Sequence, residues 1–349
     1  MRAAGDVPLV LDDRMPTAHL SAVRALVDGA TPPPGAAWAT LTSGSTGVPR
    51  IVVRTEASWR SSSAAVAELL DAGPTDGVAL SAPPASSLTL FSLAHAEDGG
   101  PRPVLLGRDG DARGAVCFHG TPQGLAALLA AGGATTVRTA LVGGSALDPA
   151  LRAEAEARKI RVVAYYGAAE LSFVAVDAGD GLRPFPGVDL DVRDGRLWVR
   201  SATVAIGYVG RRGALRRDGD WATVGDLAEI VDGRLLLRGR ADGAILTASA
   251  TVVPEEVEAA LRTLPGVADA VVFGLPAPGV GALVAAYVEP RGAGLDAQAL
   301  RAGAAAALAP ASRPRVWFHG RVPRTLAGKA ARDEVIRRAT AGEATRLVG

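Results

Sequence analysis

The 349-residue chain contains a single cysteine, Cys117, which excludes an internal disulfide. Its four histidines are scattered, and neither an H-x-x-x-H pattern nor a Cys/His cluster offers a structural metal site. No run of about 20 residues is free of both charge and glycine. The N-terminus has no long apolar segment followed by a cleavage site. These absences predict an unexported protein of a reducing cytoplasm with no membrane partner.

The chain also lacks a strong charge of either sign. Lys and Arg together number 37 and Asp and Glu 36, so the formal net charge is +1, and the arginines are not clustered into one basic run. This balance offers no general attraction for nucleic acid, which we therefore do not expect as a partner. A hydrophobic content of 48% excludes wholesale disorder, and the length suits two domains.

Apolar runs alternate with stretches of helical spacing through much of the chain, which predicts an α/β layered domain. A further helix should start at Asp148 and Pro149, a capping residue followed by proline in the first turn. Other helices are expected over residues 19–28, 56–72 and 122–131, and strands over residues 103–107, 114–118 and 139–143.

The second half of the chain has a different pattern. Asp-Gly pairs at residues 194–195 and 232–233 lie between alternating strands and predict hairpins of a small β subdomain. From residue 243 onward, helices and strands predict a small α+β unit. We therefore expect an N-terminal domain over residues 1–240, containing the β subdomain at 183–240, and a C-terminal domain over residues 241–349.

The segment LTSGSTGVPR, residues 41–50, joins two glycines to four small hydroxyl residues. Gly44 and Gly47 can adopt positive φ and let successive backbone N–H groups converge on an anion, while Arg50 adds a fixed positive charge. The flanking apolar runs predict a hairpin, unlike the Walker A loop, which opens a helix. A polyphosphate site is the functional interpretation, and a Gly/Ser linker is the other. The hydroxyl residues are Thr42, Ser43, Ser45 and Thr46.

LTSGSTGVPR resembles the phosphate loop of the adenylate-forming superfamily, which includes acyl-CoA ligases, adenylation domains and luciferases. Further segments resemble family blocks in the family's order, up to about residue 332. They are TALVGGS, RVVAYYGAAE, WATVGDL, GRADGAI and VPRTLAGKAAR. The chain lacks most of the usual N-terminal subdomain, and its outline is similar to compact o-succinylbenzoate-CoA ligases. The resemblance implies a large α/β domain with a mobile α+β domain behind it.

By this resemblance, Tyr166 would stack on adenine and Asp226 would accept both ribose hydroxyls. Glu170 would hold the Mg²⁺ that bridges the phosphates, since a hard cation prefers oxygen ligands. Lys329 would contact the carboxylate and the α-phosphate as the main catalytic residue. On the residues alone, a core aromatic is the alternative for Tyr166, while a structural turn aspartate and a solvent-facing lysine are the commoner interpretations of Asp226 and Lys329.

The remaining roles also come from the resemblance. Arg240 would reach ribose or phosphate, and Asp242 would be the hinge between the domains. Gly143, Gly144 and Ser145, which follow the predicted strand TALV, would border the nucleotide and the acyl group, together with Gly167. The nucleotide residues of this set are Gly144, Ser145 and Gly167, and the acyl-pocket residues are Gly143, Ser86 and Ser87.

Several positions depart from the family pattern. Arg50 stands where lysine is usual, and Ala169 replaces a threonine that would bond to phosphate. Ala85, Ser86 and Ser87 occupy places that often hold an aromatic residue and a histidine, which indicates either an altered acyl pocket or an ordinary strand-to-helix turn. Ser249 replaces a glycine beside the pantetheine tunnel, and its side chain would narrow that tunnel.

The sequence therefore predicts an ATP- and Mg²⁺-dependent enzyme that joins a small carboxylic acid to AMP. The acyl group would then pass to a thiol, for which CoA is the leading candidate. An adenylase that serves an amine or an acyl carrier protein is the alternative within the fold. The alternative to an enzyme is a binding protein that kept the fold and lost the activity. The acid and the oligomeric state, including a homodimer, stay open.

Overall fold

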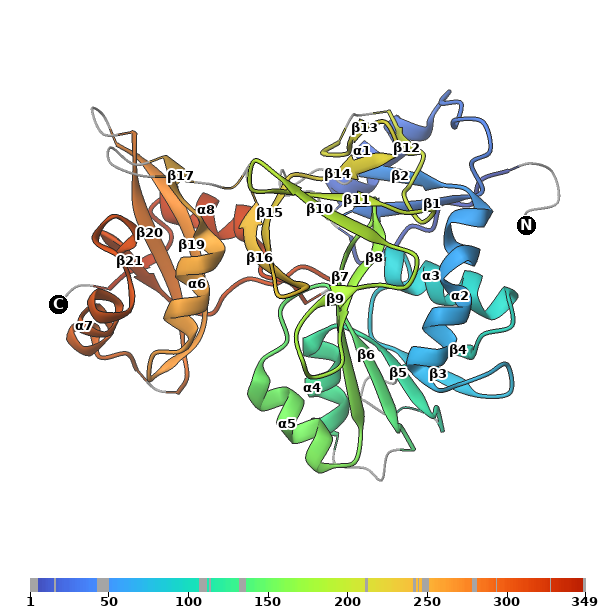
Figure 1. Ribbon diagram of the computed structural model, residues 1–349. Helices are drawn as coiled ribbons and strands as arrows, with labels where there is room; N and C mark the ends of the chain where they lie inside the picture. Colours follow the sequence, from blue (N-terminus) through green and yellow to red (C-terminus); the bar gives the residue numbers. More distant parts are fainter. Residues whose placement is uncertain are drawn as a thin grey trace.

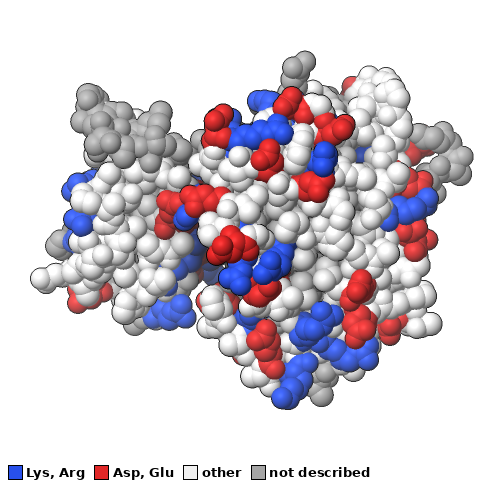
Figure 2. All heavy atoms as spheres, in the orientation of Figure 1, with Lys and Arg blue, Asp and Glu red and all other residues white. Residues whose placement is uncertain are grey.

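The computed structural model of the chain carries no ligand. It describes residues 6–347 except residues 16, 43–49, 107–111, 113, 132–135, 211–212, 241–242, 244, 247–250, 278–280, 293 and 327. Figure 1 shows a large N-terminal part, coloured blue to yellow, and a smaller C-terminal part, coloured orange to red, standing to one side. Figure 2 shows basic and acidic side chains interspersed over the face that it draws.

A three-stranded sheet carries the hairpin that the sequence predicts around the glycine-rich loop. β1 (Trp38–Thr42) pairs antiparallel with β2 (Arg50–Arg54), and Thr42 lies opposite Arg50 at the end that leads into the connecting residues. β12 (Gly207–Val209) adds the third strand, and α1 (Thr17–Val27) packs nearby through Val23. The hairpin prediction is confirmed, while the loop residues Ser43, Gly44, Ser45, Thr46 and Gly47 lie outside the described residues.

A seven-stranded sheet forms the centre of the N-terminal part, in the order β4-β3-β5-β6-β7-β8-β9. The strands from β4 to β7 are parallel, and β8 and β9 join antiparallel at one edge. β5 starts later than the sequence predicts. The strands are β3 (Gly77–Leu80), β4 (Arg102–Leu105), β5 (Cys117–Gly120), β6 (Thr139–Val142), β7 (Arg161–Ala168), β8 (Ser172–Asp177) and β9 (Arg183–Pro184).

The helices of this part begin where the sequence predicts. In α5 the Asp148 side chain accepts a hydrogen bond of 2.8 Å from the backbone N–H of Ala150, and Pro149 occupies the first turn. Thr55, Ser86 and Thr121 cap three other helices in the same way. The helices are α2 (Glu56–Leu70), α3 (Ser87–Glu97), α4 (Pro122–Ala130) and α5 (Pro149–Ala157).

The β subdomain is built on the two predicted Asp-Gly hairpins. Asp194 and Gly195 have φ of 50° and 73°, and Asp232 and Gly233 have φ of 50° and 71°, so both turns need left-handed backbone at both residues. The strands are β10 (Asp189–Arg193), β11 (Arg196–Arg200), β13 (Arg216–Asp218), β14 (Trp221–Thr223), β15 (Asp226–Val231) and β16 (Arg234–Arg240).

The C-terminal part is the α+β unit that the sequence predicts. Its four-stranded sheet has the order β19-β20-β21-β22, and a core around Val257, Leu261 and Val272 joins the sheet to a helix. Residues 241–242, which include Asp242 and the predicted start of the C-terminal domain, lie outside the described residues, so the boundary and the hinge stay predictions. The elements are β17 (Ile245–Leu246), β18 (Thr251–Val252), α6 (Pro254–Arg262), β19 (Val267–Ala277), β20 (Gly281–Pro290), α7 (Ala297–Ala307), η2 (Pro310–Ser312), β21 (Val316–His319), α8 (Arg332–Thr340) and β22 (Thr345–Arg346).

No helix in the described part of the chain has the length and apolar character that crossing a membrane requires.

Candidate active site

A cleft of about 1790 Å³ lies between the N-terminal part and the C-terminal part. It opens at the carboxyl ends of the parallel strands, where α/β proteins commonly bind ligands. Gly143 itself does not line the cleft, but it lies against the ring of Tyr165, which does. Asp242, Ser249 and the side chain of Arg240 lie outside the described residues. The predicted residues that line the cleft are Thr42, Arg50, Ser86, Ser87, Gly144, Ser145, Tyr166, Gly167, Glu170, Asp226 and Lys329.

Lys329 reaches the cleft from the loop between β21 and α8. Gly144 has a φ of 89°, and a Cβ at that position would lie 3.4 Å from Lys329 Cε and 3.9 Å from Nζ. The loop turns tightly, because the Thr325 N–H donates to the Lys329 carbonyl at 2.8 Å. Lys329 is one of only two lysines in the chain, the other being Lys159. Its ammonium therefore lies beside the glycine pair that closes the β6 strand.

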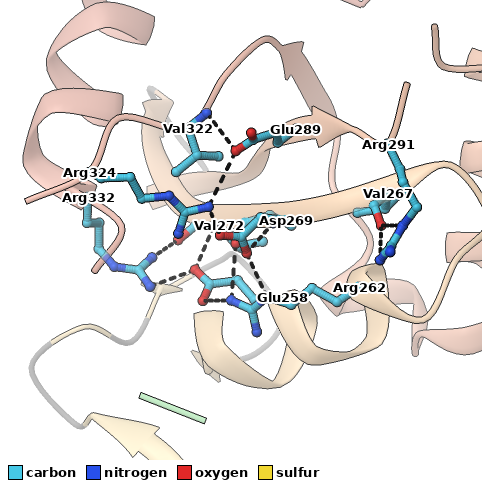
Figure 3. Close-up of polar contacts among 11 residues, drawn as sticks. Glu258, Arg262, Val267, Asp269, Val272, Glu289, Arg291, Val322, Arg324 and Arg332 are labelled. Atoms are coloured by element: carbon cyan, nitrogen blue, oxygen red, sulfur yellow. Dashed lines mark hydrogen bonds and ion pairs between the residues drawn. The ribbon is translucent and has the colours of Figure 1, made fainter. Parts of the chain in front are cut away.

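Both ends of the Lys329 loop are fixed to the C-terminal sheet by arginines (Figure 3). Arg324 lies 2.7 Å from an Asp269 oxygen and 3.4 Å from a Glu289 oxygen. Arg332 lies 2.6 Å from an oxygen of Glu258, which is 4% exposed. Burial raises the pKa of Glu258, against the opposing charge of Arg332. The loop is thus held on three carboxylates, which belong to β19, β20 and α6.

This anchoring predicts that Arg324→Ala weakens catalysis more than stability. Arg324 is about one-third exposed, so its ion pairs should contribute less than about 1 kcal/mol to the free energy of unfolding. A looser Lys329 loop should lower the rate of adenylate formation about tenfold, because catalysis needs close positioning. Single-turnover adenylation and urea unfolding measure the two effects.

Arg291→Ala is the matched control, because among the described residues the Arg291 side chain bonds to the Val267 carbonyl, at 3.3 and 3.4 Å, and forms no hydrogen bond or ion pair with the Lys329 loop. It should change neither quantity. Equal losses of rate in the two variants would contradict a positioning role for Arg324.

Glu170 lies in the turn between β7 and β8 and is 7% exposed. Its Oε1 accepts a hydrogen bond of 2.8 Å from the Tyr208 hydroxyl. The neighbouring Ala169 carbonyl accepts two hydrogen bonds from Arg54, a fully buried guanidinium at the end of β2. Burial lowers the pKa of Arg54 to about 9, and the nearby Glu170 charge opposes that shift. Arg54 therefore fixes the turn and partly balances the carboxylate.

The residues around Glu170 fit a cation that arrives with phosphates. The described residues contain no group of three or more His, Cys, Asp or Glu side chains that would hold a metal by themselves. Mg²⁺ is commonly bound by one or two carboxylates together with substrate phosphate oxygens. Thr42 Oγ1, also facing this region, is buried without a hydrogen-bond partner in the described part of the chain.

Tyr166 and Asp226 meet across the cleft. The Tyr166 hydroxyl donates a short hydrogen bond to an Asp226 oxygen, which joins the end of β7 to the start of β15. Asp226 pairs in the sheet with the backbone of Arg240, which brings two of the predicted nucleotide residues together on neighbouring strands. A carboxylate has two acceptor oxygens, which suits the two neighbouring hydroxyls of a sugar diol.

Aromatic side chains close the inner end of the cleft. Phe173 packs against Phe91 and Tyr165, with ring centroids 4.9 and 4.7 Å apart. A Cβ at Gly143 would lie 2.2 Å from Tyr165 Cζ, so only glycine leaves room for this ring. His119, on β5, is 1% exposed, and burial lowers its pKa to about 3. It is therefore neutral at pH 7.

The buried histidine predicts that the protein loses stability in mild acid. The unfolded chain binds a proton at His119 below pH 6.5, whereas the folded chain does so only near pH 3. The free energy of unfolding should therefore fall by about 1.4 kcal/mol per pH unit, or about 2 kcal/mol between pH 6.5 and 5. Urea unfolding gives the free energy of unfolding at pH 7 and at pH 5. The loss between the two pH values should be smaller by about 2 kcal/mol in His119→Gln than in the parent protein. Identical pH dependence in both proteins would contradict it. His95, whose pKa burial also lowers, adds a slope of the same sign to both.

Four residues of this site were missed by sequence reasoning. Arg54, His119, Tyr165 and Tyr208 lie within strands, and only Tyr165 stands in a named segment, RVVAYYGAAE, where the prediction concerned its neighbour Tyr166. The one available signal was their polarity inside apolar runs, such as the arginine that ends RIVVR.

Residues 6–209 match the model of a family described as "AMP-binding enzyme", and residues 256–329 match "AMP-binding enzyme C-terminal domain". The 2-succinylbenzoate–CoA ligase of Salmonella typhimurium is 32% identical over 67% of this chain and 53% of its own length. A Mycobacterium tuberculosis protein named "Probable 2-succinylbenzoate–CoA ligase" is 34% identical over 95% of this chain and 91% of its own. The chain thus spans about half the length of the first of these relatives.

Solved structures agree with the fold. E. coli MenE with bound OSB-AMS has a TM-score of 0.76 at 25% identity, covering 88% of this chain and 70% of that one. The amide bond synthetase McbA from Marinactinospora thermotolerans has a TM-score of 0.74 at 25% identity, covering 87% and 68%.

Proposed function

Because the chain belongs to the AMP-binding enzyme family, we propose that it activates a carboxylic acid with ATP and transfers the acyl group to CoA. A carboxylate oxygen attacks the α-phosphorus of ATP, the bond to pyrophosphate breaks, and an acyl-adenylate forms. The thiolate sulfur of the acceptor then attacks the acyl carbon, and AMP leaves. The observation that carries the proposal is Lys329 beside Gly144, in the same cleft as Glu170 and Asp226.

Each residue has a role that follows from its charge and place. The Lys329 ammonium neutralises charge on the acid and on the α-phosphate as they approach each other, which is an electrostatic contribution. Asp226 accepts hydrogen bonds from the ribose hydroxyls, and the Tyr166 ring covers adenine. Arg50, opposite Thr42 at the loop end of the hairpin, binds the phosphates. Glu170 would hold Mg²⁺, which when bound neutralises phosphate charge.

The relatives provide the acids and acceptors to test. A pyrophosphate-release screen over 2-succinylbenzoate, simple aryl acids, dicarboxylic acids and medium-chain acids would be run with and without CoA. A phosphopantetheinylated carrier protein is a second acceptor, because a fatty acid–[acyl-carrier-protein] ligase of Mycobacterium marinum is 34% identical over 34% of this chain. We expect acid-dependent pyrophosphate release and a thioester with CoA. Release that no acid stimulates would refute the proposal.

Glu170→Gln should raise the Mg²⁺ concentration needed for half-maximal adenylation about tenfold. The amide keeps the shape of the side chain and the hydrogen bond from Tyr208, but it removes the negative charge. Tyr208→Phe is the control, because it leaves the charge and removes only the hydroxyl. A Mg²⁺ titration that Glu170→Gln does not shift would place the cation elsewhere.

A further inference from the structure

A buried arginine holds the turn that carries Glu170. Arg54 donates two hydrogen bonds to the Ala169 carbonyl and one to the Thr203 carbonyl. The hydroxyl of Thr203 donates in turn to the Leu171 carbonyl at 2.9 Å. Arg54 and Thr203 therefore fix the backbone on both sides of Glu170, which limits where its carboxylate lies.

The charge of Arg54 has no contacting partner that explains it. Its side chain is 0% exposed, and its acceptors among the described residues are neutral carbonyls. A buried charge without a contacting counter-charge is costly, and an apolar residue would avoid that cost. The Glu170 charge acts on the guanidinium and opposes the effect of burial on its pKa. The relation between these two charges is therefore the feature to be explained.

A second arginine lies on the same face of the three-stranded sheet. Arg50 and Arg54 begin and end β2, and residues four apart in a strand point to the same face. Tyr208 lies opposite Val52, between them, and donates to Glu170 at 2.8 Å. Burial and the Glu170 charge raise the pKa of Tyr208, whereas the Arg50 charge lowers it, so this charge also reaches the hydroxyl. Two positive charges of β2 thus act around one carboxylate.

This combination of charges disfavours a free cation. Glu170 contributes one negative charge, whereas Arg50 and Arg54 contribute two positive charges, so their sum is positive. A hydrated divalent cation is repelled by such a sum, but the complex of Mg²⁺ with ATP carries a net negative charge and is attracted. Salt screens the charge of Arg54 only weakly, because the side chain is fully buried.

On the basis of the role proposed for Glu170, we propose that Arg54 is a positioning residue that makes cation binding at Glu170 depend on the nucleotide. The planar fork of its guanidinium holds the turn in place. Its charge, together with that of Arg50, keeps the carboxylate from binding a divalent cation until phosphate oxygens supply further negative charge. Cation and nucleotide therefore bind as one unit.

The test measures Mn²⁺ binding to the protein without nucleotide, by loss of the electron paramagnetic resonance signal of the free ion. The parent protein should bind Mn²⁺ weakly. Arg54→Gln keeps a donor for a carbonyl but removes the charge, and it should bind Mn²⁺ at least about tenfold more tightly. Arg50→Gln should act in the same direction, and it leaves the hydrogen bonds of the buried guanidinium in place. Adding Glu170→Gln to either variant should cancel the gain.

Arg54→Lys separates the charge from the fork. It keeps the charge, so Mn²⁺ should stay weakly bound without nucleotide, but an ammonium lacks the planar fork that spans both carbonyls. The looser turn should lower kcat for pyrophosphate release about tenfold and change KM for MgATP less than about threefold. A parental kcat in this variant would overturn the positioning role.

Leu129→Ala is the control for a loss of stability. Leu129 is 2% exposed in α4 and packs in a core that does not line the cleft. The substitution should lower the unfolding temperature and leave Mn²⁺ affinity and KM for MgATP unchanged. Thermal unfolding shows whether the Arg54 variants fold, and if they do not, the parent protein and Arg50→Gln still decide the charge effect.

The outcomes separate this inference from the proposed function, because Mn²⁺ binding needs no turnover. Tight binding by the parent protein would overturn the inference, and so would folded glutamine variants that bind no more tightly than the parent. Either result with acid-dependent pyrophosphate release would leave the adenylation in place. A gain in Mn²⁺ binding that requires Glu170, in a protein that releases no pyrophosphate with any acid, would sustain the inference and refute the adenylation.

Discussion

Replacing Lys329 with alanine is expected to slow acyl-adenylate formation at least about hundredfold. Loss of one preorganised charge or donor at a reacting centre typically costs about 10²–10³ in kcat. Lys329 lies on a loop whose two ends are held by Arg324 and Arg332, so the substitution leaves the anchoring contacts in place. The free energy of unfolding should therefore change by less than about 1 kcal/mol. Single-turnover formation of acyl-AMP measures the chemical step.

The chain offers a matched control for this prediction. Lys159 is the only other lysine, and it lies after α5 with a φ of 65°. Lys159→Asn removes a positive charge and tolerates the left-handed backbone, which alanine does not. The control should keep the parental rate. If Lys329→Ala folds and forms acyl-AMP as fast as Lys159→Asn, the role proposed for Lys329 is wrong.

Asp226→Ala should lower kcat/KM for ATP about hundredfold, mainly through KM. A carboxylate that accepts two hydroxyl donors makes two charge-assisted hydrogen bonds, each contributing about 1.5–3 kcal/mol. These bonds exist in the ground state as well as the transition state, so their loss weakens binding more than turnover. Initial rates over a range of ATP concentrations separate the two parameters.

Tyr166→Phe tests whether the loss comes from the carboxylate itself. This variant removes the hydroxyl that donates to Asp226 and keeps the ring proposed to cover adenine. It should raise KM for ATP only a few-fold, because Asp226 still accepts from ribose. A loss as large as that of Asp226→Ala would show that the hydrogen bond between the two residues, and not ribose binding, governs the effect.

Local signals in the sequence were sufficient for most of the fold. The Asp-Gly pairs at residues 194–195 and 232–233 fix their hairpins, because few other pairs adopt left-handed backbone at both positions. Asp148 with Pro149 predicts a helix start for a similar reason. The start of β5 was less well predicted, because a short apolar run such as GAVCF does not mark its own ends.

Residues of the candidate site could be predicted from the sequence only where they stand in a recognisable motif. Lys329 and Glu170 stand in recognisable segments, whereas Arg54 and His119 acquire their meaning from partners that are distant in the chain. Arg54 holds the Ala169 carbonyl, 115 residues away, and His119 meets Tyr165, 46 residues away. Such contacts depend on how the strands are ordered in the sheets, which local propensity does not determine.

The most direct test of the account uses a carboxylic acid with both carboxylate oxygens labelled with ¹⁸O. An acid selected from the screen is incubated with ATP, Mg²⁺ and CoA, and the nucleotide product is analysed by mass spectrometry. Attack of the carboxylate on the α-phosphorus predicts AMP that contains one ¹⁸O atom, together with unlabelled pyrophosphate. Unlabelled AMP, or ADP with labelled inorganic phosphate, would contradict the formation of an acyl-adenylate in this cleft.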